Sequence, residues 1–95
     1  MTRLGKQLLE EAAVVIDARG DHYDEPIKNF TRIARLWSVI LDIEVTPMQV
    51  GLCMDAVKTA RLCATPEHWD SLVDKAGYAA ATAECLKPIG TDDSS

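Results

Sequence analysis

The sequence predicts an all-α protein, a compact bundle of four helices. Proline stands in the expected first turn of three of them, at Pro26, Pro47 and Pro66, where its fixed φ and missing N–H cost the helix nothing. The one run that alternates polar and apolar residues, 42–45, has no second strand to pair with. We therefore expect a single domain over residues 1–87, a disordered polar tail over 88–95, and helices over residues 4–19, 26–41, 47–62 and 66–86.

The first predicted helix, residues 4–19, carries apolar side chains along one face and is expected to end at Gly20. Glu11 projects beside that face. A carboxylate in that position is typical of the rim of a packed face or of a surface ion pair. The apolar face consists of Leu4, Leu8, Ala12, Val15 and Ile16.

A short polar segment, residues 20–25, joins this helix to the next. It contains His22 and Tyr23, whose side chains can bind a ligand, although an ordinary turn with a helix cap would use the same residue types. The helix over 26–41 has the clearest amphipathic pattern in the chain, so it must pack against other helices. Asn29 borders its apolar face and is a ligand-binding candidate. That face is made of Ile27, Phe30, Ile33, Ala34, Trp37, Ile40 and Leu41.

The third helix, residues 47–62, starts with the sequence signature of a capping box, Thr46 followed by Gln49 three positions later. An apolar line of residues runs along it at helical spacing and continues, at its last position, into an arginine. This line is Val50, Met54, Val57 and Arg61.

Arg61 is the most informative residue of that helix, with Lys58 on its flank. An arginine in line with a core face needs a carboxylate or a bound anion, because burying an unpaired guanidinium is costly. The nearest carboxylates in the sequence are Asp70 and Asp74 on the following helix. The sequence therefore predicts that Arg61 pairs with one of them or binds an anionic ligand.

The fourth helix, residues 66–86, is the one around which the chain is organised. Thr65 is its expected cap, and Pro88 stops it. The short link Cys63-Ala64 predicts that it lies antiparallel to the third helix. Its apolar face, Trp69, Leu72, Val73, Ala76, Ala80 and Ala83, is bordered by Asp70, Asp74 and Tyr78.

Composition excludes several classes of function. A net charge of −5 opposes DNA binding, and no apolar run approaches the ~20 residues of a membrane span. The first residues lack the apolar segment of a secretory signal, which predicts a cytoplasmic protein. Cys53, Cys63 and Cys85 are odd in number without CxxC spacing, so we expect core thiols rather than disulfides or a zinc site. A chain this short with alanine-rich faces is expected to form a homo-oligomer.

One resemblance to a known family is carried by segments 8–13, 21–24, 29–38, 58–62 and 70–79. These segments resemble a small phage-encoded family of unknown function, which predicts the same all-α domain over most of residues 8–86.

A fainter similarity is to MazG-type all-α nucleoside triphosphate pyrophosphohydrolases, in which acidic helical motifs hold Mg²⁺. Glu10-Glu11 and the run Asp70 to Asp74 occupy comparable places in this sequence. The similarity would make Glu11, Asp70 and Asp74 the metal ligands.

Three functions remain open on the sequence. The first is binding of a nucleotide or other phosphorylated small molecule without efficient turnover, which needs no cofactor or uses Mg²⁺. The second is a structural or interaction protein that binds a host protein. The third is Mg²⁺-dependent hydrolysis of a phosphoanhydride. The ligand site predicted for the first function consists of His22, Tyr23, Asn29, Lys58, Arg61 and Tyr78.

Overall fold

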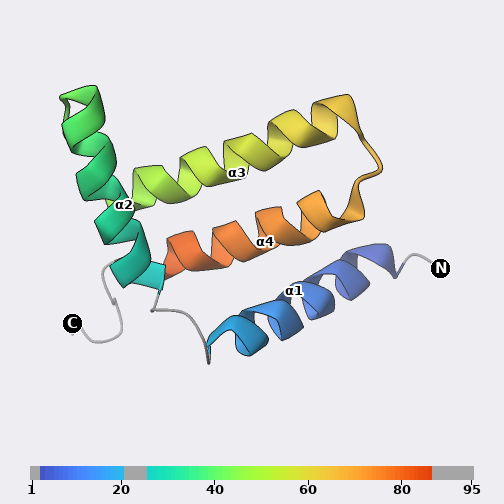
Figure 1. Cartoon of the computed structure of the whole chain (residues 1–95). Coiled ribbons are helices and arrows are strands. Elements are labelled where there is room, and N and C mark those ends of the chain that lie inside the picture. The colour runs from blue at the N-terminus through green and yellow to red at the C-terminus, as the bar shows by residue number, and fades with distance from the viewer. Residues whose placement is uncertain (1–2, 21–25, 87–95) are drawn as a thin grey trace.

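The computed structural model describes residues 3–20 and 26–86, and it confirms the all-α prediction. The described ranges contain four helices and no strand (Figure 1). His22, Tyr23 and the predicted tail 88–95 lie outside the described residues. The helices are α1 (Leu4–Gly20), α2 (Pro26–Leu41), α3 (Pro47–Ala64) and α4 (Trp69–Glu84).

Helix α4 is the centre of the arrangement. It lies antiparallel to α3 along one side and parallel to α1 along the other, while α2 is steeply inclined to this layer and covers the end where α3 begins and α4 finishes (Figure 1). Within the described ranges α4 contacts all three other helices, whereas α1 contacts α4 alone. The attachment of α1 therefore depends on a single helix.

The hydrophobic core is small. It is centred where α2 crosses α3, on Phe30, Ala34 and Val50, with Trp37 and Tyr78 packed partly buried against it. In the described residues five hydrophobic side chains are buried, whereas twelve large hydrophobic side chains are exposed. A single small core of this kind contributes limited stability. The large apolar side chains that remain exposed are candidates for an interaction surface.

The start of α3 follows the predicted capping box. The Thr46 side-chain oxygen accepts a hydrogen bond from the Gln49 backbone N–H at 3.2 Å, and the Gln49 side-chain oxygen accepts one from the Thr46 N–H at 2.9 Å. The loop before it is held by Ser38, whose Oγ donates to the Ala34 carbonyl at 2.7 Å and accepts from the Val45 N–H at 2.8 Å. Local hydrogen bonds thus fix the turn from α2 into α3.

The predicted start of the fourth helix at residue 66 is wrong, since α4 begins at Trp69. Thr65 instead ends α3, and its N–H donates to the Arg61 carbonyl at 2.9 Å. A residue before proline is disfavoured in helical conformation, so Pro66 forces Thr65 out of the helix and acts as a stop for α3. The predicted third helix was accordingly two residues too short, and the connection is the turn 65–68.

Candidate functional site

Helices α3 and α4 are joined by two reciprocal lysine–aspartate pairs. Lys58 Nζ on α3 lies 3.0 Å from Asp74 Oδ2 on α4. Lys75 Nζ on α4 lies 2.9 and 3.0 Å from the two carboxylate oxygens of Asp55 on α3, and it also donates to Thr59 Oγ1 at 2.6 Å. These side chains are half-buried, so each pair contributes modestly to stability and chiefly fixes the register of the two helices.

The prediction that Arg61 pairs with Asp70 or Asp74 is wrong. Arg61 is exposed, and none of the described carboxylates lies within 4.0 Å of it, whereas Asp74 pairs with Lys58. The face that α3 turns towards α4 is rotated by about one residue from the predicted line. It consists of Gly51, which is buried, and of Asp55, Lys58 and Leu62, which are half-buried.

Replacement of Arg61 should therefore matter less than replacement of Asp74. We expect Arg61→Met to change the free energy of unfolding by less than about 0.5 kcal/mol, and Asp74→Ala to lower it by about 1 kcal/mol, because Lys58 loses its partner in a half-buried place. Urea denaturation followed by circular dichroism measures both values. Lys58→Met, which removes the other partner of the pair, is the matched control. A larger loss of unfolding free energy for Arg61→Met than for Asp74→Ala would contradict the pairing of Lys58 with Asp74.

The three predicted metal ligands are used in different ways. Glu11 Oε1 accepts a hydrogen bond from Trp69 Nε1 at 2.9 Å, which ties α1 to α4. Asp70 is exposed in the first turn of α4, where a carboxylate suits the positive end of the helix dipole. Asp74 pairs with Lys58. The residues that the structure describes contain no group of three histidine, cysteine or acidic side chains that could hold a metal ion.

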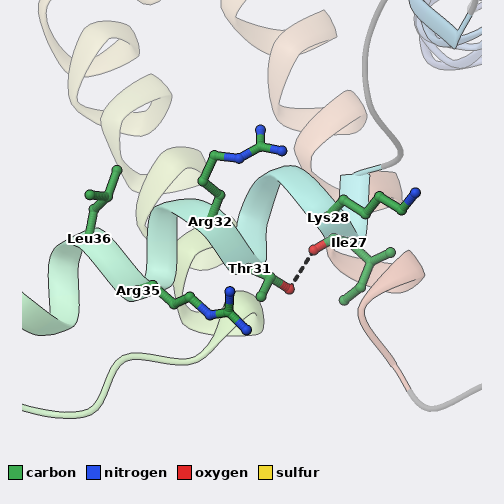
Figure 2. Close-up of a pocket in the computed structure, with 6 residues that line it drawn as sticks. All are labelled: Ile27, Lys28, Thr31, Arg32, Arg35 and Leu36. Atoms are coloured by element: carbon green, nitrogen blue, oxygen red, sulfur yellow. Dashed lines mark hydrogen bonds between the residues drawn. The ribbon is translucent and has the colours of Figure 1, made fainter.

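The remaining predicted ligand-binding residues lie near the core. Tyr78 is partly buried against the core cluster of Phe30, Ala34 and Val50, and Asn29 is half-buried on α2. The pocket of Figure 2 is lined by α2 residues alone, and neither Tyr78 nor Asn29 nor Arg61 is among them. His22 and Tyr23 lie outside the described residues, so the ligand site as a whole stays a prediction.

One arrangement of polar side chains was missed by sequence reasoning. The Ser71 Oγ lies 2.7 Å from Nδ1 of His68 at the start of α4, and Ser71 is completely buried. A serine without solvent access cannot meet a substrate, so this hydrogen bond satisfies a buried hydroxyl and stabilises the first turn of the helix.

The prediction that the cysteines are core thiols is wrong for two of them. Cys53 and Cys63 on α3 are exposed, and Cys85 at the end of α4 is half-buried. Burial, with a smaller contribution from the Glu84 carboxylate, raises the pKa of the Cys85 thiol. All three thiols are free.

One exposed surface, which we call the α2 outer face, is made of Lys28, Arg32, Arg35, Leu36, Val39 and Ile40. At its N-terminal end it contains a shallow pocket lined by Ile27, Lys28, Thr31, Arg32, Arg35 and Leu36 (Figure 2). The cationic side chains of this pocket point away from the helix axis in different directions. At the C-terminal end the surface becomes apolar, and Val39 and Ile40 are 80% and 75% exposed.

This apolar end corrects the predicted core of the second helix. Ile40 and Leu41 were expected on the packed face, but both are exposed. The end of α2 projects past the start of α3, so Ile40 and Leu41 remain exposed (Figure 1). Periodicity identifies the face of a helix, but it does not say how far along the helix the neighbours extend.

Fold and site together define a small all-α protein with ion-paired central helices and an exposed apolar face on α2. The chain belongs to the family described as domain of unknown function DUF6378, whose model matches residues 7–86. This confirms the predicted resemblance to a phage-encoded family of unknown function.

Two curated relatives come from mycobacteriophages. The chain is 39% identical over 77 residues to the Gene 55 protein of Mycobacterium phage D29, a match that covers 80% of this chain and 51% of that protein. It is 34% identical over 83 residues to the Gene 55 protein of Mycobacterium phage L5, covering 85% of this chain and 53% of that protein. The chain therefore spans about half the length of these relatives. No solved structure matches it.

The structure also bears on the membrane prediction. None of the described helices is both long enough and apolar enough to cross a bilayer.

Proposed function

We propose that this protein is a phage interaction protein that acts by docking the α2 outer face onto a helix of another polypeptide chain. The observation that carries the proposal is the exposure of large aliphatic side chains there, with Val39 and Ile40 almost free of contacts. Such side chains cost free energy when left in water, and contiguous exposed apolar surface is typical of interaction sites. The partner that this surface selects is an amphipathic helix with an apolar centre and a carboxylate at one end.

The expected free energies favour docking through apolar side chains over docking through ion pairs. Full burial of a Val, Leu or Ile side chain contributes about 1.5–3 kcal/mol, whereas an exposed ion pair contributes at most about 1 kcal/mol. The three aliphatic side chains of the α2 outer face, Leu36, Val39 and Ile40, therefore supply most of the affinity. Arg35, which lies on the flank of the apolar end, supplies orientation.

A photo-cross-linking amino acid placed at Val39 tests the proposal. We expect a single cross-linked species from position 39 and none from position 9, because Leu9 is a similarly exposed aliphatic residue on α1, away from the α2 outer face. A second substitution, Arg35→Glu, should abolish the cross-link if the surface is used specifically. Equal cross-linking from both positions, or none from position 39, would contradict the proposal.

A second candidate function is binding of a phosphorylated small molecule, the leading possibility on the sequence. The pocket of Figure 2 favours it, because three of its lining residues, Lys28, Arg32 and Arg35, are cationic in a chain whose net charge is −5. A thermal-shift panel of nucleotides with and without Mg²⁺ tests it. A nucleotide at about 100 times its dissociation constant should stabilise the protein by ~2.7 kcal/mol, and Lys28→Glu should remove that gain.

A further inference from the structure

The charged part of the α2 outer face carries one sign only. Lys28, Arg32 and Arg35 follow one another at spacings of four and three positions inside α2, so they form one line along the helix. Val39 continues this cationic line four positions further on. All four side chains are exposed, and Pro26–Leu41 contains no aspartate or glutamate. The line therefore passes from cations to an aliphatic side chain within the helix itself.

This cationic line is an exception on an acidic protein. The chain has a net charge of −5, whereas α2 carries three cationic side chains and no acidic one. Among the described residues no carboxylate lies within 4.0 Å of Lys28 or Arg35, since the lysine–aspartate pairs that join α3 to α4 use other residues. An acidic partner is therefore repelled by the protein as a whole and attracted at α2.

The spread of these cations selects an extended partner over a small anion. Lys28 and Arg35 are seven positions apart, which is about 10 Å along the helix axis. Their side chains also diverge as they leave the helix (Figure 2). The oxygens of a single phosphate group lie too close together to contact both cations. A second helix has the same rise per residue, so carboxylates seven positions apart on it match the two cations.

We propose that the partner of the α2 outer face is an acidic amphipathic helix, with carboxylates spread over two successive turns and aliphatic side chains in the turns beside them. This inference rests on the proposed function and names the class of its partner. The carboxylates lie opposite Lys28 and Arg35, and the aliphatic side chains cover Leu36 and Val39. A nucleic-acid backbone offers the same charge, but it has no aliphatic surface to cover Val39, which is 80% exposed.

Labelled synthetic helical peptides test this preference. Two peptides carry glutamates in one half, at spacings of four and three positions, and leucines in the other half, with the glutamates first in one peptide and last in the other. Two further peptides carry lysine in place of every glutamate. Fluorescence anisotropy should show that one glutamate peptide binds about tenfold more tightly than its lysine counterpart, because ion pairs replace repulsions. Equal binding of glutamate and lysine peptides would overturn the proposal.

Charge reversal on the protein locates the contact. Arg35→Glu should weaken binding of the glutamate peptide about tenfold, because Arg35 lies one turn from Val39 and holds the peptide beside the apolar contact. Lys28 lies about 16 Å from Val39 along the helix axis, so Lys28→Glu should weaken binding only about threefold and leave the apolar contact in place.

Arg61→Glu is the matched control, because Arg61 is an exposed arginine on α3. It changes the net charge by the same amount and should leave the affinity for the glutamate peptide unchanged. Circular dichroism of each variant verifies that the helices are retained. An equal loss of affinity for Arg61→Glu and Arg35→Glu would show an effect of overall charge and would overturn the assignment to α2.

A short DNA duplex is the competing polyanion. We expect it to leave the glutamate peptide bound, because the duplex cannot replace the contacts of the leucines. Displacement of the peptide by the duplex would mean that negative charge alone is recognised, and the acidic helix would be the wrong partner.

The peptide and cross-linking results together separate this inference from the proposed function. If position 39 cross-links to a polypeptide while glutamate and lysine peptides bind alike, the docking function stands and the acidic partner is wrong. If the glutamate peptide binds with the expected preference while position 39 cross-links to nothing, the docking function fails and the preference of this surface for an acidic helix stands.

Discussion

Substitution of Gly51 by alanine is expected to destabilise the protein by about 2 kcal/mol, which lowers the melting temperature by roughly 10 °C for a domain of this size. Gly51 is buried where α3 passes closest to α4 and α2. A Cβ at this position would collide with Oγ1 of Thr82 and would lie 3.1 Å from Cε2 of Phe30. Thr82 cannot move freely, since its Oγ1 donates a hydrogen bond to the Tyr78 carbonyl at 2.7 Å.

Two further variants make this expectation specific. Gly77 lies inside α4 with open space around the position of its missing Cβ, so Gly77→Ala should instead stabilise the protein by about 0.5–1 kcal/mol. Thr82→Ala removes the atom that the new methyl group would strike, so the double variant G51A/T82A should be more stable than G51A alone. Thermal denaturation of the three variants measures these differences in stability. A Gly51→Ala variant as stable as the unsubstituted protein would contradict the close approach of α3 and α4.

Substitution of Trp69 by alanine is expected to release α1 from the rest of the fold, at a cost of about 2–3 kcal/mol. Within the described ranges α1 contacts α4 alone, and the hydrogen bond from Trp69 Nε1 to Glu11 joins the two helices. Loss of the indole removes both that bond and the packing of a large aromatic ring. Amide hydrogen exchange should show that α1 loses protection well before α3 does.

Two controls separate packing from hydrogen bonding at this contact. Trp69→Phe retains most of the ring but not the N–H, and Glu11→Gln retains an acceptor oxygen, so each should cost about 1 kcal/mol or less. Equal loss of protection in α1 and α3 for Trp69→Ala would mean that α1 does not detach separately.

The two candidate functions make different demands on Arg35. If the pocket binds a phosphorylated molecule, Arg35 and Lys28 act together, and both substitutions weaken binding. If the α2 outer face docks onto a helix of another chain, Arg35 orients that helix, and Lys28→Glu leaves the cross-link from position 39 intact. Cross-linking from position 39 in the Lys28→Glu and Arg35→Glu variants therefore distinguishes a ligand pocket from a docking surface.

The sequence by itself determined the class of fold and the starts of two helices. The starts of α2 at Pro26 and of α3 at Pro47, together with the capping box of Thr46 and Gln49, followed from side chains and backbone groups within four residues of one another. Such interactions do not depend on the rest of the molecule. The sequence also singled out the fourth helix as the one around which the chain is organised, although α4, with 16 residues, is shorter than α3, with 18.

Only the tertiary structure decided how those helices face one another. The line of Arg61 and the line of Lys58 differ by one residue step of about 100° around α3, and both are compatible with the sequence pattern. The close contact at Gly51 turns Lys58, not Arg61, towards Asp74. Likewise, Thr65-Pro66 could start a helix or stop one, and the continuation of α3 to Ala64 made it a stop.

The same reason explains why the candidate docking surface was not visible in the sequence. Ile40 continues the apolar pattern of α2, but whether it is buried depends on where α3 and α4 end in space. The pattern of apolar residues fixes the direction in which a side chain points from its own helix. Burial also requires a neighbouring helix at the same level along the helix axis. For Ile40 and Leu41 at the end of α2 the chain supplies no such neighbour among its described residues, and this made an apparent core face into exposed surface.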